Sequence, residues 1–411
     1  MTADAVIVAT ARSPIGRAAK GSLTDVRPDD LAAYVIQAAL DKVPQLDPAT
    51  IDDLYLGCAE PRDEQGGNMA RRVAVQLGLD ELPAVTVNRF CASSVQTARM
   101  AFHAIKAGEG DVFVSAGVEC VSRYRHFGSA GVDPEDTQNP AFAPAVARTA
   151  RYAEDNATWH DPRENGELPD IYIAMGQTAE HVATSRGVSR AVQDEFGVRS
   201  QNNAEAALRA GFFAREIVPY PKADGTVVDA DDGPRPGTTL EKVQGLKPVF
   251  RPDGTVTAGN CCPLNDGAAA VVIMSSTKAA ELGITPLARI VSTAASALSP
   301  EVMGLGPVEA SRRALARAGM SISDVDLVEI NEAFAAQVVP SAEDLGIGYD
   351  TGWEKLNVHG GAIAVGHPFG MTGARIMTTL LNGLEFTDKE VGLETMCVGG
   401  GQGMAVILQR L

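Results

Sequence analysis

One cysteine stands where the chain could use it as a nucleophile. Cys91 follows the apolar run at 85–87 and opens a segment of small residues, so we expect it at the N-terminus of a helix. The unpaired N–H groups and the positive dipole end of a helix stabilise a thiolate. This position therefore predicts a depressed pKa and a nucleophilic role for Cys91. A small buried thiol that only packs is the alternative interpretation.

His367 lies in a glycine-rich run from Asn357 to Gly370. Glycines at this density fit a backbone that turns sharply or approaches a ligand, and Pro368 biases the preceding residue away from helix. A histidine fixed in this way can serve as the general base for a cysteine. His359, in the same run, is equally well interpreted as a hydrogen-bonded structural residue.

A second glycine-rich segment, 396–403, holds Cys397 between two expected strands near the C-terminus. Accessible backbone N–H groups in such a loop suit an oxyanion hole, which stabilises negative charge on a reacting oxygen. Cys397 would then act as an acid/base thiol, although a plain hairpin turn explains the same glycines. Asn331 follows the expected strand 326–330 and could hold a water molecule or a substrate oxygen.

Composition and motifs exclude several other classes. Of 411 residues, 35 are Lys or Arg and 52 are Asp or Glu, and this net charge of −17 argues against a nucleic-acid partner. No apolar run approaches the ~20 residues of a membrane span, and no basic targeting segment precedes residues 5–9. Six scattered cysteines fit a reduced protein. We therefore expect a cytoplasmic enzyme of two or three domains, without a membrane span.

Metal and dinucleotide sites are not expected either. The adjacent pair Cys261 and Cys262 lacks the C-x₂-C spacing and partner histidines of a zinc site. No G-x-G-x-x-G motif opens a helix, as a dinucleotide site would require.

The elements that must position these residues alternate between short apolar runs and helical patterns. This alternation predicts an α/β fold whose sheet is covered on both faces. The first half contains expected strands at 6–8, 53–57, 85–87, 112–116 and 268–274, with helices at 30–42 and 92–107. The second half repeats the order with strands at 287–291, 326–330, 393–398 and 404–408 and helices at 308–318 and 371–381. This repetition predicts a duplicated unit, in which Cys91 and His367 precede equivalent helices.

A long insertion separates the two halves at about 121–250. It is rich in Pro, Gly and charge but contains a strong helix at 190–209, with Ser189 as N-cap and Gly211 as stop. A structureless connection of this length is uncommon, so we expect a lid or a substrate-binding insertion. Near its end, basic residues outnumber the lone acid Glu241: Arg235, Lys242, Lys247 and Arg251. They suit an anionic ligand, and a solvated surface is the alternative.

Together, these residues resemble the thiolase family of acyl-CoA acyltransferases. The matching motifs span nearly the whole chain in the family's order: 11–16, 88–91, 176–180, 257–260, 265–269, 331–334, 360–370 and 397–401. The resemblance implies a thiolase-like α/β fold of duplicated βαβαβαββ halves, layered α-β-α-β-α, with an inserted loop domain. We place the N-terminal half at 1–120 and 251–280, the substrate- and CoA-binding loop domain at 121–250, and the C-terminal half at 281–411.

The resemblance also implies a role for each candidate residue. Cys91 matches the nucleophile that takes the acyl group as a thioester, and Cys397 matches the acid/base that moves the proton on the acetyl α-carbon. His367 matches the activating histidine, which forms one oxyanion hole with a water held by Asn331. The N–H groups of Cys91 and Gly399 match the second hole. The expected substrate and CoA contacts are Arg235, Lys242, Ala258, Cys262, Met175, Ser94, Phe334 and His359. Coenzyme A is then a substrate, and no cofactor or metal is required.

Departures from the family pattern favour a degradative member. Short-chain members typically have a histidine where this chain has Ala174, and His359 followed by Gly-Gly-Ala is similar to the fatty-acid-oxidation members. Ser94 replaces a common glycine and is expected to add bulk near the thioester, and Cys262 replaces a common serine. The expected reaction cleaves 3-ketoacyl-CoA with CoA to acetyl-CoA and a shortened acyl-CoA, in fatty-acid β-oxidation.

Three other functions remain open from the sequence. They are biosynthetic acetoacetyl-CoA formation, a catalytically silent acyl-CoA-binding protein, and a decarboxylating ketoacyl synthase. The synthase would use a second histidine where this chain has Asn331 or Cys397. The resemblance further implies a homodimer or homotetramer and a β-oxidation multienzyme partner.

Overall fold

The fold of the first half is a five-stranded sheet with one added short strand. The structure is a computed structural model that describes residues 3–124, 137–351 and 353–411, so residues 125–136 of the expected loop domain lie outside the described part. The strand order is β1 (Ala5–Arg12), β8 (Asn265–Ser275), β5 (Val112–Cys120), β3 (Asp53–Gly57) and β4 (Ala84–Val87), and β2 (Gly16–Arg17) pairs with β8. β4, β3 and β5 are parallel, whereas β8 is antiparallel to both of its neighbours.

The second half repeats this arrangement. Its strand order is β9 (Ala288–Ala297), β12 (Gln402–Arg410), β11 (Val391–Val398) and β10 (Leu327–Ile330), with β10 parallel to β11 and β12 antiparallel to both neighbours. The two half-sheets meet where β1 pairs with β9 at Val6–Arg289 and Ile7–Ala288. The expected α/β class and the duplicated order are confirmed.

One element of the duplication is reduced in the second half. The counterpart of β4 is a single parallel bridge between Val328 and Leu356. Trp353 and Asn357, on either side of Leu356, adopt positive φ angles of 51° and 45°. A left-handed residue interrupts an extended backbone, so no longer strand can form there.

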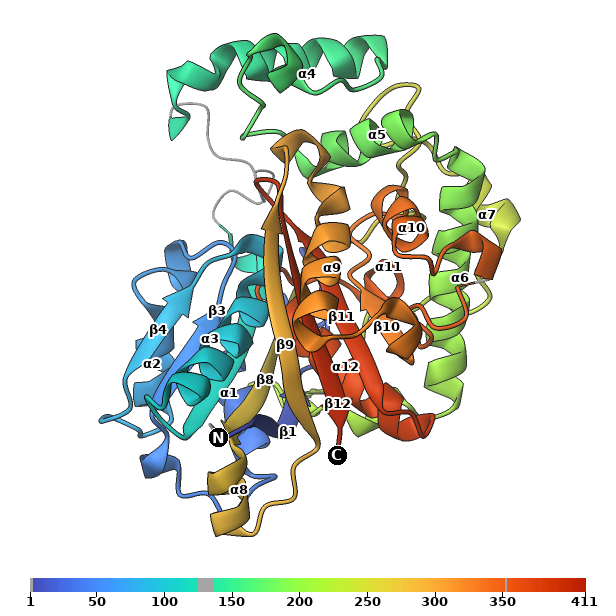
Figure 1. Cartoon of the computed structure of the whole chain (residues 1–411). Helices are drawn as coiled ribbons and strands as arrows, with labels where there is room; N and C mark the ends of the chain where they lie inside the picture. The colour runs from blue at the N-terminus through green and yellow to red at the C-terminus, as the bar shows by residue number, and fades with distance from the viewer. Residues whose placement is uncertain (1–2, 125–136, 352) are drawn as a thin grey trace.

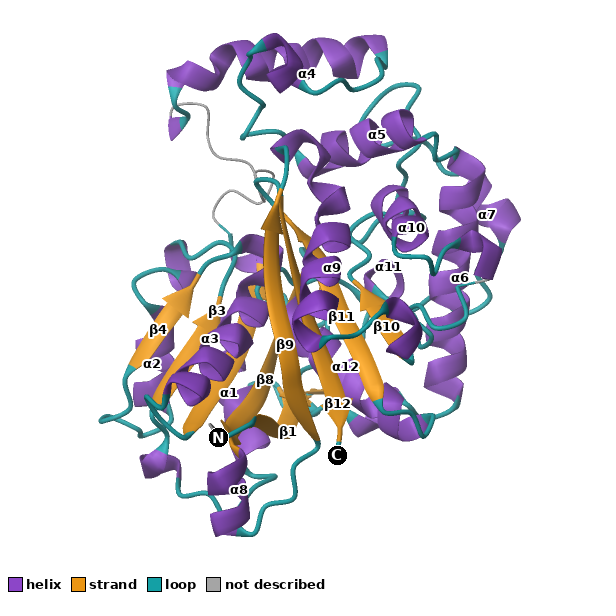
Figure 2. Cartoon of the chain, viewed as in Figure 1, coloured by secondary structure: helices purple, strands orange, loops and turns teal. Residues whose placement is uncertain are grey.

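Helices and half-sheets alternate in five layers, as the buried clusters between them show. Figure 2 distinguishes the helices from the strands by colour. α1 (Pro28–Leu40) and α2 (Met69–Gln76) pack on the outer face of the first half-sheet. α3 (Ser93–Ala107) and α12 (Thr372–Phe386) lie between the half-sheets, where Val95 and Leu380 share one buried cluster with Val271 and Val406. α9 (Gly306–Ala318) and α10 (Ala335–Asp344) cover the outer face of the second half-sheet. Apolar residues on both faces of each sheet therefore build the layered arrangement.

The insertion between the halves is largely helical. It contains α4 (Ala143–Asp155), α5 (Met175–Arg186), α6 (Arg190–Arg209), the hairpin β6 (Tyr220–Pro221) and β7 (Val227–Val228), and α7 (Leu240–Gln244). In Figure 1, α5, α6 and α7 run alongside the second half, and α4 lies above α5. The expected helix at 190–209 is α6: the Ser189 hydroxyl accepts a hydrogen bond from the Val192 N–H, and Gly211 has φ +70° just beyond the helix.

Two short helices complete the fold: α8 (Ser276–Leu282) follows β8, and α11 (Ala362–Val365) lies in the glycine-rich run before α12. None of the helices in the described part of the chain is long and apolar enough to cross a membrane.

Candidate active site

Cys91 lies in a short 3₁₀ turn (Phe90–Ala92) between β4 and α3. The turn is fixed from both sides: the Phe90 N–H donates to Asn88 Oδ1 at 2.8 Å, and the Ser93 hydroxyl donates to the Phe90 carbonyl at 2.6 Å. Phe90 itself has φ +46°, an uncommon conformation for a residue with a side chain. The half-buried thiol of Cys91 is thus held at the start of α3, as the sequence predicts.

The resting charge of Cys91 differs from the sequence prediction. Burial raises the pKa of the Cys91 thiol to about 12, although the backbone N–H groups of Gly399 and of Cys91 itself act in the opposite direction. The expected depression of this pKa is therefore wrong, because loss of solvent outweighs the helix end and the two N–H donors. The thiol is neutral at rest and needs a base to become a nucleophile.

His367 has the protonation state of such a base. Its Nδ1 lies 2.6 Å from the Thr372 hydroxyl, which donates its own hydrogen to the Pro368 carbonyl at 2.7 Å. The hydroxyl must then accept from Nδ1–H, which leaves Nε2 unprotonated and able to accept a hydrogen bond. Burial, with a smaller effect of the Arg375 charge, lowers the pKa of His367 to about 3. The imidazole is therefore neutral and its Nε2 can accept a proton.

Asn331 joins His367 from the end of β10. Its Nδ2 lies 3.2 Å from His367 Nε2, and its backbone N–H donates to the Thr395 carbonyl at 3.0 Å. Within the described residues, the buried Oδ1 of Asn331 has no hydrogen-bond partner. A buried acceptor of this kind is suited to hold a water molecule beside the imidazole.

Cys397 and Gly399 approach Cys91 from the end of β11. Cys397 is fully buried; burial raises the pKa of its thiol, and the neighbouring Cys91 adds to the shift. The turn from β11 to β12 is shaped by Gly400 and Gly401, whose φ angles are +74° and +78°. The turn is a hairpin that also directs the Gly399 N–H toward the Cys91 sulfur. Of the five expected catalytic residues, Cys91, Cys397 and Gly399 thus lie together, and His367 and Asn331 form a hydrogen-bonded pair.

Two buried glutamates brace the loops around these residues. Glu119 accepts hydrogen bonds from the N–H groups of Ala59 and Gly370, both at 2.8 Å, and so ties the His367 loop to the end of β3. Glu332 accepts from the Ser200 hydroxyl at 2.6 Å and the Ile363 N–H at 3.0 Å. Sequence reasoning missed Glu119; a lone acid within the apolar strand 112–120 is the signal that could have identified it.

A cavity of about 400 Å³ is lined in part by Cys261 and Cys262. All four residues expected to contact the CoA moiety line it, together with Arg17, which sequence reasoning missed: Arg235, Lys242, Ala258 and Cys262. Cys262 is close enough to Cys91 and Cys397 to interact electrostatically with both. The cavity therefore brings cationic side chains together with Cys262, which neighbours both Cys91 and Cys397. Lys247 is exposed away from it, and Arg251 is buried, where its Nε donates to Gln177 Oε1 at 2.8 Å.

An apolar cluster covers Cys397 on the side of the insertion. Met175 and Phe334, both expected substrate contacts, pack with Cys262 and Cys397 in one cluster. The rings of Phe334 and Phe250 lie edge to face, with centroids 6.1 Å apart. This wall can exclude water from the thiols and contact an apolar substrate.

Two expected substrate contacts lie outside the site. Ser94 is fully buried, and its hydroxyl accepts a hydrogen bond from the Ala374 N–H at 2.9 Å, so it caps α12 instead of facing the thiol. His359 stacks on Phe212 with ring centroids 3.7 Å apart and meets the edge of Phe386, at the far end of α12 from His367. Both residues serve packing, and their expected substrate roles are corrected.

Replacement of His359 by Phe should reduce the loss of folding stability at acid pH. Burial lowers the pKa of His359 to about 4, so between about pH 6.5 and pH 4 the unfolded chain binds a proton that the folded chain does not. The free energy of unfolding therefore falls as the pH falls through this window. His359→Phe keeps the stack on Phe212 and should remove about 1–2 kcal/mol of the loss between about pH 7 and pH 5.

Urea unfolding of both proteins at the two pH values measures this difference. The exposed His160, replaced by Gln, is the control. An unchanged pH dependence in His359→Phe would show that the ring is protonated equally in both states.

Comparisons with known proteins cover both halves of the chain. The family model for "Thiolase, N-terminal domain" matches residues 5–277, and that for "Thiolase, C-terminal domain" matches residues 284–410. The chain is 43% identical to a 3-ketoacyl-CoA thiolase of Saccharophagus degradans, over 99% of this chain and 98% of that protein. It is 42% identical to the 3-ketoacyl-CoA thiolase of Aeromonas salmonicida, over 99% and 100%.

Two solved structures share the fold over the full length. The acetyl-CoA acetyltransferase of Bacillus anthracis superposes with a TM-score of 0.86 at 36% identity, covering 100% of this chain and 99% of that one. Human mitochondrial 3-ketoacyl-CoA thiolase superposes with a TM-score of 0.83 at 34% identity and the same coverage.

Proposed function

The chain belongs to the thiolase family, and from this premise we propose that it cleaves 3-ketoacyl-CoA with coenzyme A. The products are acetyl-CoA and an acyl-CoA shortened by two carbons. The observation that carries the proposal is a neutral His367 whose unprotonated Nε2 faces Asn331, together with two neutral neighbouring thiols, Cys91 and Cys397, next to the cysteine that lines the cationic cavity, Cys262. The full-length relatives that are 42–43% identical and named 3-ketoacyl-CoA thiolases support the degradative direction.

The first half-reaction forms an acyl-enzyme. His367 Nε2 takes the proton of Cys91 as its sulfur attacks the 3-keto carbon. The N–H groups of Cys91 and Gly399 already point at this sulfur and would stabilise the oxyanion. The bond between C2 and C3 then breaks, and Cys397 donates its proton to C2, which releases acetyl-CoA. His367 and the water held by Asn331 would stabilise the enolate oxygen.

The second half-reaction returns the enzyme to its resting state. The imidazolium proton of His367 restores Cys397, and the neutral imidazole then takes the proton of a second CoA thiol. The CoA sulfur attacks the acyl carbon, Cys91 leaves as thiolate, and it recovers the proton from His367. All atoms and charges balance, and every proton carrier is a residue of this chain. The substrate of the first half-reaction is 3-ketoacyl-CoA, and free coenzyme A enters as the substrate of the second.

The finer organisation is part of the same proposal. We assign 1–120 with 251–280 and 281–411 to the two thiolase halves and 121–250 to the loop domain that binds substrate. A homodimer or homotetramer in the cytoplasm, with a β-oxidation multienzyme partner, is the assembly we propose. A ketoacyl synthase is less well supported, because Asn331 and Cys397 stand where it would use a second histidine.

Steady-state cleavage of 3-ketoacyl-CoAs from four carbons upward tests the proposal. We expect CoA-dependent formation of acetyl-CoA that extends to long acyl chains, because the apolar wall of Met175 and Phe334 can take an alkyl chain. Assays without CoA are the control. Activity confined to the four-carbon substrate would favour the biosynthetic function, and binding of acyl-CoA without any cleavage would favour a silent binding protein.

A further inference from the structure

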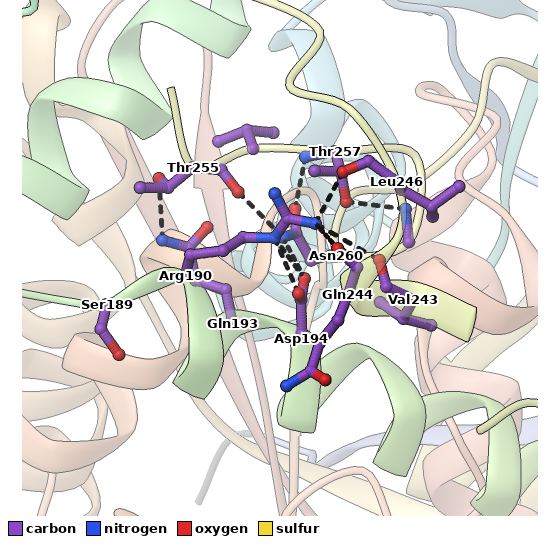
Figure 3. Close-up of polar contacts among 12 residues, drawn as sticks. Ser189, Arg190, Gln193, Asp194, Val243, Gln244, Leu246, Thr255, Thr257 and Asn260 are labelled. Carbon is purple, nitrogen blue, oxygen red and sulfur yellow. Dashed lines mark hydrogen bonds and ion pairs between the residues drawn. The ribbon is translucent and has the colours of Figure 1, made fainter. Parts of the chain in front are cut away.

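Arg190, the first residue of α6, connects two segments of the insertion (Figure 3). Its Nε lies 2.8 and 2.7 Å from the two carboxylate oxygens of Asp194, one helical turn later. Its Nη2 donates to the carbonyls of Val243, Gln244 and Leu246 at 3.3, 3.4 and 2.9 Å. Carbonyls at a helix C-terminus lack intrahelical partners, so one guanidinium caps α7 and fastens it to α6.

Asp194 continues the connection into a loop. Its buried carboxylate also accepts a hydrogen bond from Asn260 Nδ2 at 2.9 Å. The same amide donates to the Thr255 carbonyl at 3.0 Å and accepts from the Thr257 N–H at 2.8 Å. The loop 255–260 is therefore closed on itself and held against α6 by one carboxylate.

Both fastened segments form walls of the cavity. α7 and the residues after it contribute Lys242, Val243 and Leu246, whereas the loop contributes Ala258 and Gly259. The two walls touch: a Cβ atom at Gly259 would lie 2.7 Å from Val243 Cγ1. Arg190 and Asp194 do not line the cavity, so they act on it through these walls.

The loop and the residues after it also form hydrogen bonds with the segment that follows Asn331. The Cys262 N–H donates to the Ala333 carbonyl at 3.0 Å, and the Ala335 N–H donates to the Asn260 carbonyl at 2.8 Å. These contacts lie two and four residues beyond Asn331. Neither of these two hydrogen bonds is made by Arg190 or by α7, so we expect both to remain when α7 is released.

We propose that Arg190 is a positioning residue for coenzyme A binding, which holds the outer wall of the cavity, α7, in the conformation that closes on the ligand. The inference rests on the proposed function, since it takes the cavity as the CoA site. A charged donor shared by three carbonyls and a buried carboxylate makes strong hydrogen bonds. Without it, α7 would occupy the closed conformation only part of the time, and the apparent affinity for CoA falls by that fraction.

Arg190→Gln tests the inference through binding and catalysis together. We expect the KM for CoA and the Kd from calorimetry to rise about tenfold or more, with kcat within about twofold of wild type. Arg190→Lys should give intermediate values, because an ammonium can pair with Asp194 or reach the carbonyls but cannot form the planar fork. The control is Arg313→Gln on α9. Like Arg190, Arg313 pairs with a carboxylate one helical turn away, that of Glu309 at 2.7 Å, but it lies outside the cavity.

Hydrogen exchange of the backbone amides at 240–246 gives a readout that does not depend on activity. Faster exchange in Arg190→Gln, with wild-type exchange in Arg313→Gln, supports the inference. Unchanged exchange, or a loss of kcat at unchanged KM and Kd, overturns it. If the wild-type protein cleaves no 3-ketoacyl-CoA, the proposed function fails, and the exchange and CoA-binding measurements still decide whether Arg190 positions α7.

Discussion

Replacement of Cys91 by Ser should lower the rate of 3-ketoacyl-CoA cleavage by about 10⁴-fold or more, as removal of a nucleophile does in other covalent mechanisms. The serine hydroxyl fits the same turn, so the position of the helix and of the Gly399 N–H is kept. Its oxygen, however, is a weaker nucleophile than sulfur and is harder to deprotonate. The neutral His367 already has to remove a proton from a thiol whose pKa is raised to about 12. The same base cannot ionise a hydroxyl in that environment.

Mass spectrometry tests the covalent role of Cys91 directly. Mass spectrometry of wild type incubated with an acyl-CoA should show an acyl adduct on the peptide that contains Cys91, and the variant should show none. Cys120→Ala is the control, since Cys120 is another buried thiol but ends β5 outside the cavity. A Cys91→Ser variant that keeps more than a tenth of the wild-type rate would contradict the nucleophile assignment.

Sequence reasoning succeeded where local pattern and duplication carry the information. Cys91 and His367 precede equivalent helices, α3 and α12, and the structure places both helices side by side between the half-sheets. The four expected CoA contacts, from two separate segments, line one cavity. Apolar periodicity and glycine spacing are properties of the chain itself, so they can be read before any tertiary contact is known.

The wrong predictions concern residues whose interaction partners are distant in the chain. The hydrogen bond that occupies Ser94 comes from Ala374, 280 residues away. Likewise, the helix end that should depress the pKa of Cys91 is a local feature, whereas the desolvation that raises it comes from segments that pack over the thiol. The aromatic rings around His359 come from α12 and from the insertion. None of these environments is visible in a single sequence.

We expect Cys397 to be needed for the first half-reaction, which cleaves the carbon–carbon bond, and not for the second. Cys397→Ala should lower cleavage of 3-ketoacyl-CoA by about 10³-fold, because the proposed mechanism needs a proton for C2 and a general acid contributes roughly 10²–10⁴-fold. Exchange of labelled CoA into a simple acyl-CoA breaks no carbon–carbon bond. It needs only Cys91, His367 and the N–H donors, so it should fall less than about tenfold.

A comparison of the Cys91 and Cys397 variants shows which step each cysteine takes part in. Cys397 is fully buried at the end of β11, and its removal leaves the half-buried Cys91 and the hydrogen bond between Asn331 and His367 in place. Cys91→Ser should abolish both reactions, whereas Cys397→Ala should abolish only carbon–carbon cleavage. Equal loss of cleavage and exchange in Cys397→Ala would mean that Cys397 supports the shape of the site and moves no proton. Partial recovery of cleavage in Cys397→Ser, whose hydroxyl can still donate, would locate the proton transfer at this side chain.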